Sequence, residues 1–164
     1  MDHIDRIVAQ WNRERPDLDV GPMAVIGRVT RLAALLRAEM EKTWALYGLN
    51  AASFDVLATL RRAAPEDGLT PGDLLAETMV TSGTMTNRID QLEKAGLVER
   101  RRNPEDGRGY LIRLTSKGFA QIDAAVGEHV ETQKRLVAGL TPEQRTAFDA
   151  LTKAFHDSID PPAD

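Results

Sequence analysis

The spacing of apolar residues along the chain predicts helices over most of its length. Ile4, Ile7 and Trp11 recur at the interval of one helical face, and a proline at position 16 ends this pattern. The turn-rich stretch that follows separates the segment from the rest of the chain. We therefore expect an N-terminal arm, one helix and its linker, over residues 1–20.

Two further regions carry long apolar stripes at helical spacing, residues 23–49 and residues 116–160. Gly48 stands where a left-handed helix end belongs, and Thr141 opens a capping box before the last helix. A single chain has too small a core to cover these stripes. We expect the two regions to form a helical dimerisation region that pairs with a second copy.

Residues 50–115 combine a helix-turn-helix pattern with a strand-forming pattern. Asn50 and Thr70 are suited to cap two short helices, and a third ends at Gly96. Two stretches rich in β-forming residues then flank a turn cluster within residues 97–114. The predicted fold is mainly α with a small β-hairpin wing: a winged helix-turn-helix flanked by N- and C-terminal dimerisation helices.

Charge is distributed unevenly along this pattern. The 164 residues carry a net charge of −4. Residues 100–117 hold six basic and two acidic side chains and so carry +4, which leaves −8 on the rest of the chain. A basic segment in an acidic chain is hard to explain as a solvated face, and it indicates a polyanionic partner.

Several function classes are excluded or disfavoured by composition. The chain has no cysteine, and its three histidines are scattered, so no metal, cofactor or catalytic residue is expected. No nucleophile and base pair and no glycine-rich phosphate loop stands out, which disfavours an enzyme. No apolar run reaches about 18 residues, so we expect a cytoplasmic protein with no membrane partner.

Double-stranded DNA is the partner that this pattern favours. The second helix of the helix-turn-helix begins with short hydroxyl and amide side chains that suit a major groove, and the hairpin arginines suit the backbone or a minor groove. The alternative is a winged-helix protein-interaction module without ligand or sequence-specific DNA binding. The expected DNA-binding residues are Thr81, Ser82, Thr84, Thr86, Asn87, Arg101, Arg102 and Arg108.

The chain resembles the MarR family of bacterial transcriptional regulators. The resemblance covers nearly the whole chain and is carried by residues 69–118, above all by LEKAGLVERR, by Asp106-Gly-Arg108 in the hairpin, and by Leu114-Thr115 with Gly118. It implies a triangular homodimer that places two winged helices on a palindromic site. Arg108 would then be the wing-tip contact in the minor groove, and Asp106 would support it.

A narrower resemblance is to the urate-responsive branch of that family, which carries an extra N-terminal helix with a tryptophan. It implies a small aromatic or purine anion as ligand, release of DNA by a repressor, and a site made of Trp11, Asp55, Arg88 and Arg100. A stacking face, a charged fork and a displaceable carboxylate suit such a ligand. Trp11 fits a dimer core equally well, and Arg88 and Arg100 also fit phosphate contacts.

Overall fold

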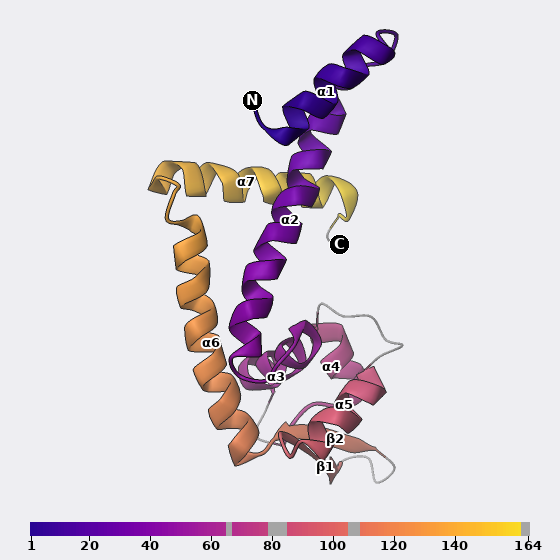
Figure 1. Cartoon of the computed structure of the whole chain (residues 1–164). Coiled ribbons are helices and arrows are strands. Elements are labelled where there is room, and N and C mark those ends of the chain that lie inside the picture. The colour runs from indigo at the N-terminus through magenta and orange to yellow at the C-terminus, as the bar shows by residue number, and fades with distance from the viewer. Residues whose placement is uncertain (65–66, 79–84, 105–108, 162–164) are drawn as a thin grey trace.

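The computed structural model describes residues 1–64, 67–78, 85–104 and 109–161. Its elements follow the predicted order, with helices at both ends of the chain and a hairpin between them (Figure 1). They are α1 (His3–Glu14), α2 (Gly21–Ala45), α3 (Ala51–Ala63), α4 (Pro71–Glu77), α5 (Met85–Lys94), β1 (Val98–Arg102), β2 (Tyr110–Leu114), α6 (Ser116–Val137) and α7 (Pro142–Ile159).

Local sequence explains where the helices begin and end. The side chain of Asn50 accepts a hydrogen bond from the Ser53 backbone N–H, and Ser53 returns one to the Asn50 backbone, which closes a capping box at the start of α3. Thr141 and Gln144 close a second capping box at the start of α7, and the Thr70 hydroxyl accepts from the Asp73 backbone N–H at the start of α4. Gly48 adopts φ 65° after α2, as the sequence predicts.

One hydrophobic core holds α3, α4, α5 and the hairpin together. It does not end at residue 115, because Ile122 and Ala125 of α6 are fully buried within it. Burying a large apolar side chain such as Ile122 contributes about 1.5–3 kcal/mol to stability. The core consists of Leu49, Phe54, Val56, Leu57, Leu60, Leu74, Met85, Ile89, Leu92, Leu97, Val98, Ile112, Ile122 and Ala125.

The hairpin pairs β1 and β2 antiparallel, with Val98 opposite Leu114 and Arg102 opposite Tyr110. Leu69 adds an isolated bridge to Ile112, so a third segment joins the edge of the wing. A bridge of one residue has no alternation of apolar and polar positions in the sequence, so hydrophobic periodicity did not predict this contact.

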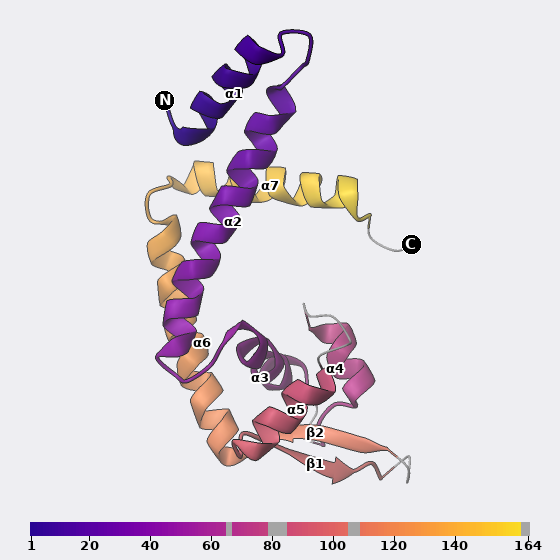
Figure 2. The same cartoon turned by 45° about the vertical axis from the view of Figure 1, so that its right-hand side comes forward.

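Two long helices, α2 and α6, lie side by side and rise from the winged helix (Figures 1 and 2). Thr43 and Thr132 are both buried between them, and their hydroxyl oxygens are 2.8 Å apart. Arg135 donates to the Thr132 hydroxyl at 2.6 Å, and the Thr43 hydroxyl donates to the Glu39 carbonyl at 3.3 Å. These bonds form a continuous polar chain across the helix pair.

The arm helix α1 folds back against the N-terminal half of α2 (Figure 2). Arg28 of α2 forms ion pairs with Asp2 and Asp5, the two residues of the capping box that starts α1. Ile4 packs close to Gly27, where a Cβ would meet it at 3.3 Å. The arm is therefore attached to α2, at the end remote from the winged helix.

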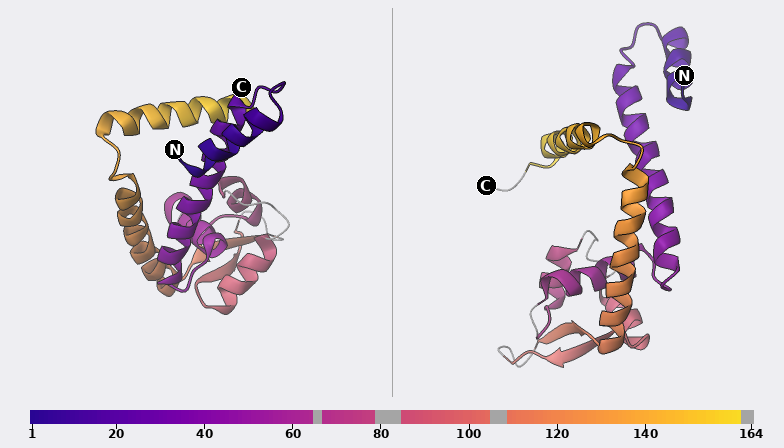
Figure 3. Two further views of the ribbon diagram at one scale, coloured as in Figure 1. Left: turned by 45° about the horizontal axis from the view of Figure 1, so that its top comes forward. Right: turned by 90° about the vertical axis from the view of Figure 1, so that its left-hand side faces the viewer.

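The terminal helices expose most of their apolar surface. No residue of α7 is buried, and this helix projects sideways from the end of α6 (Figure 3). Only Met40 and Thr43 are buried in the 25 residues of α2. The large exposed apolar side chains of these two helices are Met23, Val25, Ile26, Val29, Leu32, Leu35, Leu36, Phe148, Leu151, Phe155 and Ile159. No described helix has the length and apolar character to cross a membrane.

Candidate nucleic-acid interface and ligand cavity

The described part of α5 presents a polar strip to solvent. Met85, Ile89 and Leu92 face the core, which leaves Thr86 and Asn87 exposed at the start of the helix. The Gln91 amide donates to the Asn87 carbonyl oxygen at 3.5 Å and extends the strip by one turn. These side chains are short and carry both donors and acceptors, as readout of base edges requires.

The wing arginines differ in their surroundings. Arg101 is held by Glu99, with Nε and Oε1 2.9 Å apart, and Glu99 also accepts from Arg113 at 2.9 Å. Arg102 is exposed and forms no ion pair with any described residue. The positive charge counted along this segment is thus partly neutralised within the wing, and Arg102 is the better phosphate donor of the two.

Arg100 connects β1 to α5. Its guanidinium forms ion pairs with Asp90 and Glu93, and its backbone N–H donates to Glu93 at 3.3 Å. The hydrogen bond to Asp90 raises the pKa of Arg100 further above its ordinary value. Arg100 therefore fastens the wing to α5, and within one chain it does not line the cavity described next.

A cavity of about 720 Å³ lies between the helix pair and the winged helix. It brings together two of the four predicted ligand residues, Asp55 from α3 and Arg88 from α5. The opposite wall comes from α2 and α6. Its residues are Arg37, Glu41, Trp44, Asn50, Ala51, Ala52, Phe54, Asp55, Arg88, His129 and Gln133.

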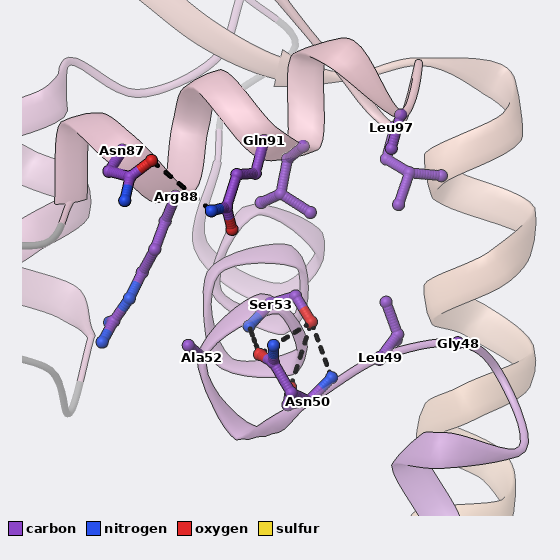
Figure 4. Close-up of a pocket in the computed structure, with 11 residues that line it drawn as sticks. Gly48, Leu49, Asn50, Ala52, Ser53, Asn87, Arg88, Gln91 and Leu97 are labelled. Atoms are coloured by element: carbon purple, nitrogen blue, oxygen red, sulfur yellow. Dashed lines mark hydrogen bonds between the residues drawn. The ribbon is translucent and has the colours of Figure 1, made fainter.

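Arg88 is the most unusual polar residue of this cavity. Among the described residues, its Nη1 is the buried side-chain nitrogen or oxygen that has no hydrogen-bond partner. Arg88 also borders a second cavity of about 320 Å³, which Asn87, Gln91 and the Asn50–Ser53 cap of α3 also line, with Gln91 pointing toward the cap (Figure 4). A buried donor without a partner costs about 1–3 kcal/mol or more, which a ligand acceptor would recover.

Three aromatic rings from three different helices form one wall of the larger cavity. Trp44 stacks on Phe54 with ring centroids 5.1 Å apart, and His129 lies 5.8 Å from Trp44 and 4.8 Å from Phe54. Sequence reasoning missed this wall. Trp44 and His129 are 85 residues apart and sit in ordinary helical patterns, so no local signal joins them.

Trp11 is not part of this cavity within one chain. It lies on α1, 43% exposed, whereas the cavity uses the far half of α2 (Figure 1). A site that joins Trp11 to Asp55 and Arg88 therefore needs a second copy of the chain. Five further predicted residues, Thr81, Ser82, Thr84, Asp106 and Arg108, lie outside the described residues.

Comparisons with known proteins identify the class. A model of the MarR family matches residues 47–109. The transcriptional regulator PecS of Dickeya dadantii is 40% identical over 148 residues, which cover 90% of this chain and 89% of PecS. The chain belongs to the MarR family.

The same class holds for other relatives of this MarR-family chain. The multiple antibiotic resistance protein MarR of Escherichia coli is 40% identical over 108 residues, covering 64% of this chain and 72% of that protein. A mutant of MarR solved with operator DNA has a TM-score of 0.70 at 26% identity, covering 88% of this chain and 96% of that one. The predicted winged helix-turn-helix is confirmed, and the relatives are transcriptional regulators, not enzymes.

Proposed function

We propose that this MarR-family protein is a cytoplasmic homodimeric repressor that binds a palindromic operator and releases it when a small aromatic or purine anion, such as urate, binds. The main support for this proposal is the position of Arg88. This residue lies on α5, the helix that would enter the major groove, and its side chain also lines the cavity. Its buried Nη1 lacks a partner that an anionic ligand would supply.

Operator binding is supported by the surface around α5. Exposed Thr86 and Asn87 lie at the start of this helix, and Arg102 lies on the adjoining wing. Together with Thr81, Ser82, Thr84, Arg101 and Arg108, they would form the DNA-binding residues, with Asp106 as wing support. The relative solved with operator DNA supports the same use of this fold here.

Homodimerisation is supported by the unpartnered apolar faces of α2 and α7. An exposed apolar surface of this extent on two helices marks an association site. Burying each large side chain would contribute about 1.5–3 kcal/mol. We therefore assign residues 1–20, 23–49 and 116–160 to the arm and the dimerisation region, and 50–115 to the DNA-binding lobe, whose core Ile122 and Ala125 of α6 complete.

An anionic aromatic ligand is supported by the pairing of an aromatic wall with Arg88 and Arg37 in one cavity. In the dimer, Trp11 of a second copy would add another aromatic surface for the ligand. Arg100 would transmit a displacement of α5 to the wing, because it connects α5 to β1. The ligand acts by favouring a dimer whose recognition helices no longer match successive major grooves. A coupling of about 1–3 kcal/mol changes operator affinity about 5- to 150-fold.

Fluorescence anisotropy on labelled DNA from upstream of the protein's own gene tests this proposal. It is measured at two salt concentrations, with and without urate and salicylate. Tight binding that weakens with salt and is relieved by urate is the expected result. Tight binding untouched by either ligand would remove the ligand site. No binding at low salt would favour the alternative of a protein-interaction module.

The variant Arg88→Gln sharpens the test, because it removes the charge of the shared residue and keeps an amide donor. We expect it to lose the urate response. Arg145→Gln on α7 is the matched control, since Arg145 is exposed and lies outside the cavity. It should respond to urate like the unaltered protein. Equal urate responses in both variants would contradict the role of Arg88.

A further inference from the structure

We propose that Trp44 holds His129 in the tautomer that carries its proton on Nε2, so that the cavity presents a fixed N–H donor for an oxygen acceptor on an aromatic ligand. The inference rests on the proposed function for the existence of the ligand. It adds a specificity-determining residue, His129, and a positioning residue, Trp44. Neither belongs to the site that the sequence predicts.

The hydrogen bond between the two side chains decides the tautomer. The indole Nε1 of Trp44 lies 3.3 Å from Nδ1 of His129. An indole nitrogen only donates, so Nδ1 must accept and cannot carry a proton. The neutral ring then has its one proton on Nε2. The same bond connects α2 to α6, one turn of α6 away from the Thr43–Thr132 contact.

Ring packing holds His129 in place. Its ring stacks on Trp44 with an interplanar angle of 23° and contacts Phe54 at a tilt of 43°. A flip of the ring would exchange Nδ1 for a carbon opposite the indole N–H and leave that donor without its acceptor. The imidazole is therefore held by the hydrogen bond from Trp44 and by ring contacts with Trp44 and Phe54.

Burial also favours the neutral form of this ring, since it lowers the pKa of His129 below its ordinary value. The titratable and charged groups that share the cavity are Arg37 and Glu41 of α2, Asp55 of α3 and Arg88 of α5. Arg37 and Glu41 pair with each other at 3.2 Å. A neutral donor from α6 thus complements the cationic donor from α5.

This arrangement specifies a chemical class. A ligand with a flat ring suits the aromatic wall, and oxygen acceptors at its edge suit Arg88 and His129. Carbonyl oxygens, phenolates and carboxylates meet this requirement. A ring whose edge carries only amino groups does not, because it would place donors against donors.

Long-range ¹H–¹⁵N NMR of the ligand-free protein tests the tautomer directly. We expect the Nδ1 of His129 to resonate as an unprotonated imidazole nitrogen and Nε2 as a protonated one. Trp44→Phe keeps an aromatic ring but removes the indole N–H, and it should shift His129 toward a mixture of both tautomers. A protonated Nδ1 in the unaltered protein, or no change in Trp44→Phe, would overturn the inference.

Calorimetric titration with urate and salicylate tests the role of the donor. His129→Gln keeps an N–H near the position of Nε2 and should bind within about threefold of the unaltered protein. His129→Leu removes the donor and should weaken binding about tenfold, the effect of one lost hydrogen bond. Undiminished binding by His129→Leu would overturn the inference. If the unaltered protein binds neither probe, the ligand proposal fails, while the NMR result still decides the Trp44–His129 assignment.

Discussion

Arg101 and Arg102 are neighbours in the chain but lie on opposite faces of the wing. Side chains alternate along a strand, so Arg102 shares the face of the buried Val98, beyond the edge of the core. Arg101 shares the outer face with Glu99 and is bound to it. The two arginines are therefore unequal candidates for DNA binding.

Arg102→Ala is expected to weaken binding to any duplex DNA by a similar factor. Removing one phosphate contact should also lower the slope of log affinity against log salt by about 0.9. Arg101→Ala serves as the matched control, because Glu99 already neutralises Arg101 and a smaller change should follow. Anisotropy titrations at several salt concentrations measure both. A larger loss in Arg101→Ala would contradict this assignment.

Association should depend on the apolar stripe of α7. Leu151 is 70% exposed in the single chain, so Leu151→Glu should cost nothing in the monomer fold but prevent burial of this face. Light scattering after size exclusion should then report monomers. Lys153→Glu introduces the same side chain two positions further along and should stay dimeric. A dimeric Leu151→Glu protein would show that α7 does not form the interface.

Gly118 marks a point where α6 touches the backbone of Leu97, between α5 and β1. A Cβ there would lie 1.9 Å from the Leu97 carbonyl oxygen, which is backbone and cannot move aside easily. Gly118→Ala should lower the free energy of unfolding by about 3 kcal/mol. Gly127 lies in the same helix with open space, and Gly127→Ala should raise that free energy by about 0.5–1 kcal/mol. Urea denaturation compares the two.

The buried threonine pair predicts a coupling that single variants hide. Thr43→Val or Thr132→Val alone removes the bond between the two hydroxyls. The remaining hydroxyl keeps one partner, the Glu39 carbonyl or Arg135, so each single variant should cost about 0.5–1.5 kcal/mol. The double variant replaces both hydroxyls by methyl groups, so its cost should be less than the sum. A double-mutant cycle from urea denaturation measures the difference. Additive losses would mean that the two hydroxyls do not interact.

Stability should fall in mild acid because partial burial of His129 lowers its pKa. The folded state lowers the pKa of His129, so the unfolded chain takes up a proton first as the pH decreases. The contribution of neutral His129 is therefore complete above the unfolded pKa of about 6.5 and is lost as the pH falls through the lower folded value. Unfolding midpoints between pH 7.5 and 5 should show this decline.

Two variants separate His129 from other acid-sensitive groups. His129→Leu cannot take up a proton, so the decline just below pH 6.5 should flatten. His156→Gln alters an exposed histidine on α7 and should keep the slope of the unaltered protein. An unchanged slope in His129→Leu would assign the acid sensitivity to a different residue.

Periodicity and capping predicted the helices well because each depends on residues a few positions apart. The Asn50–Ser53 and Thr141–Gln144 boxes are of this kind, as is the left-handed Gly48. The resemblance of residues 69–118 to a known family supplied the class. What local pattern could not supply was the contact of Leu69 with Ile112, which spans 43 positions and involves one residue at the edge of the wing.

The candidate site was predicted in part for the same reason. Asp55 and Arg88 do meet at one cavity, but Trp44 and His129, which form its aromatic wall, come from helices whose sequences look like ordinary dimerisation stripes. Arg100 was counted in the net charge of residues 100–117, although two carboxylates of α5 hold it. Charge counted along a strand does not reveal partners that a neighbouring helix brings in.

The hydrophobic core runs from Leu49 to Ala125 and receives no residue from α1 or α7. The terminal helices can therefore change in sequence independently of the hydrophobic core. In the proposed dimer, substitutions on the terminal helices would alter which copies recognise each other without disturbing the packing that shapes α5. Duplicated genes for such a dimer could diverge first in pairing and later in operator choice, and so escape mixed dimers before their DNA targets differ.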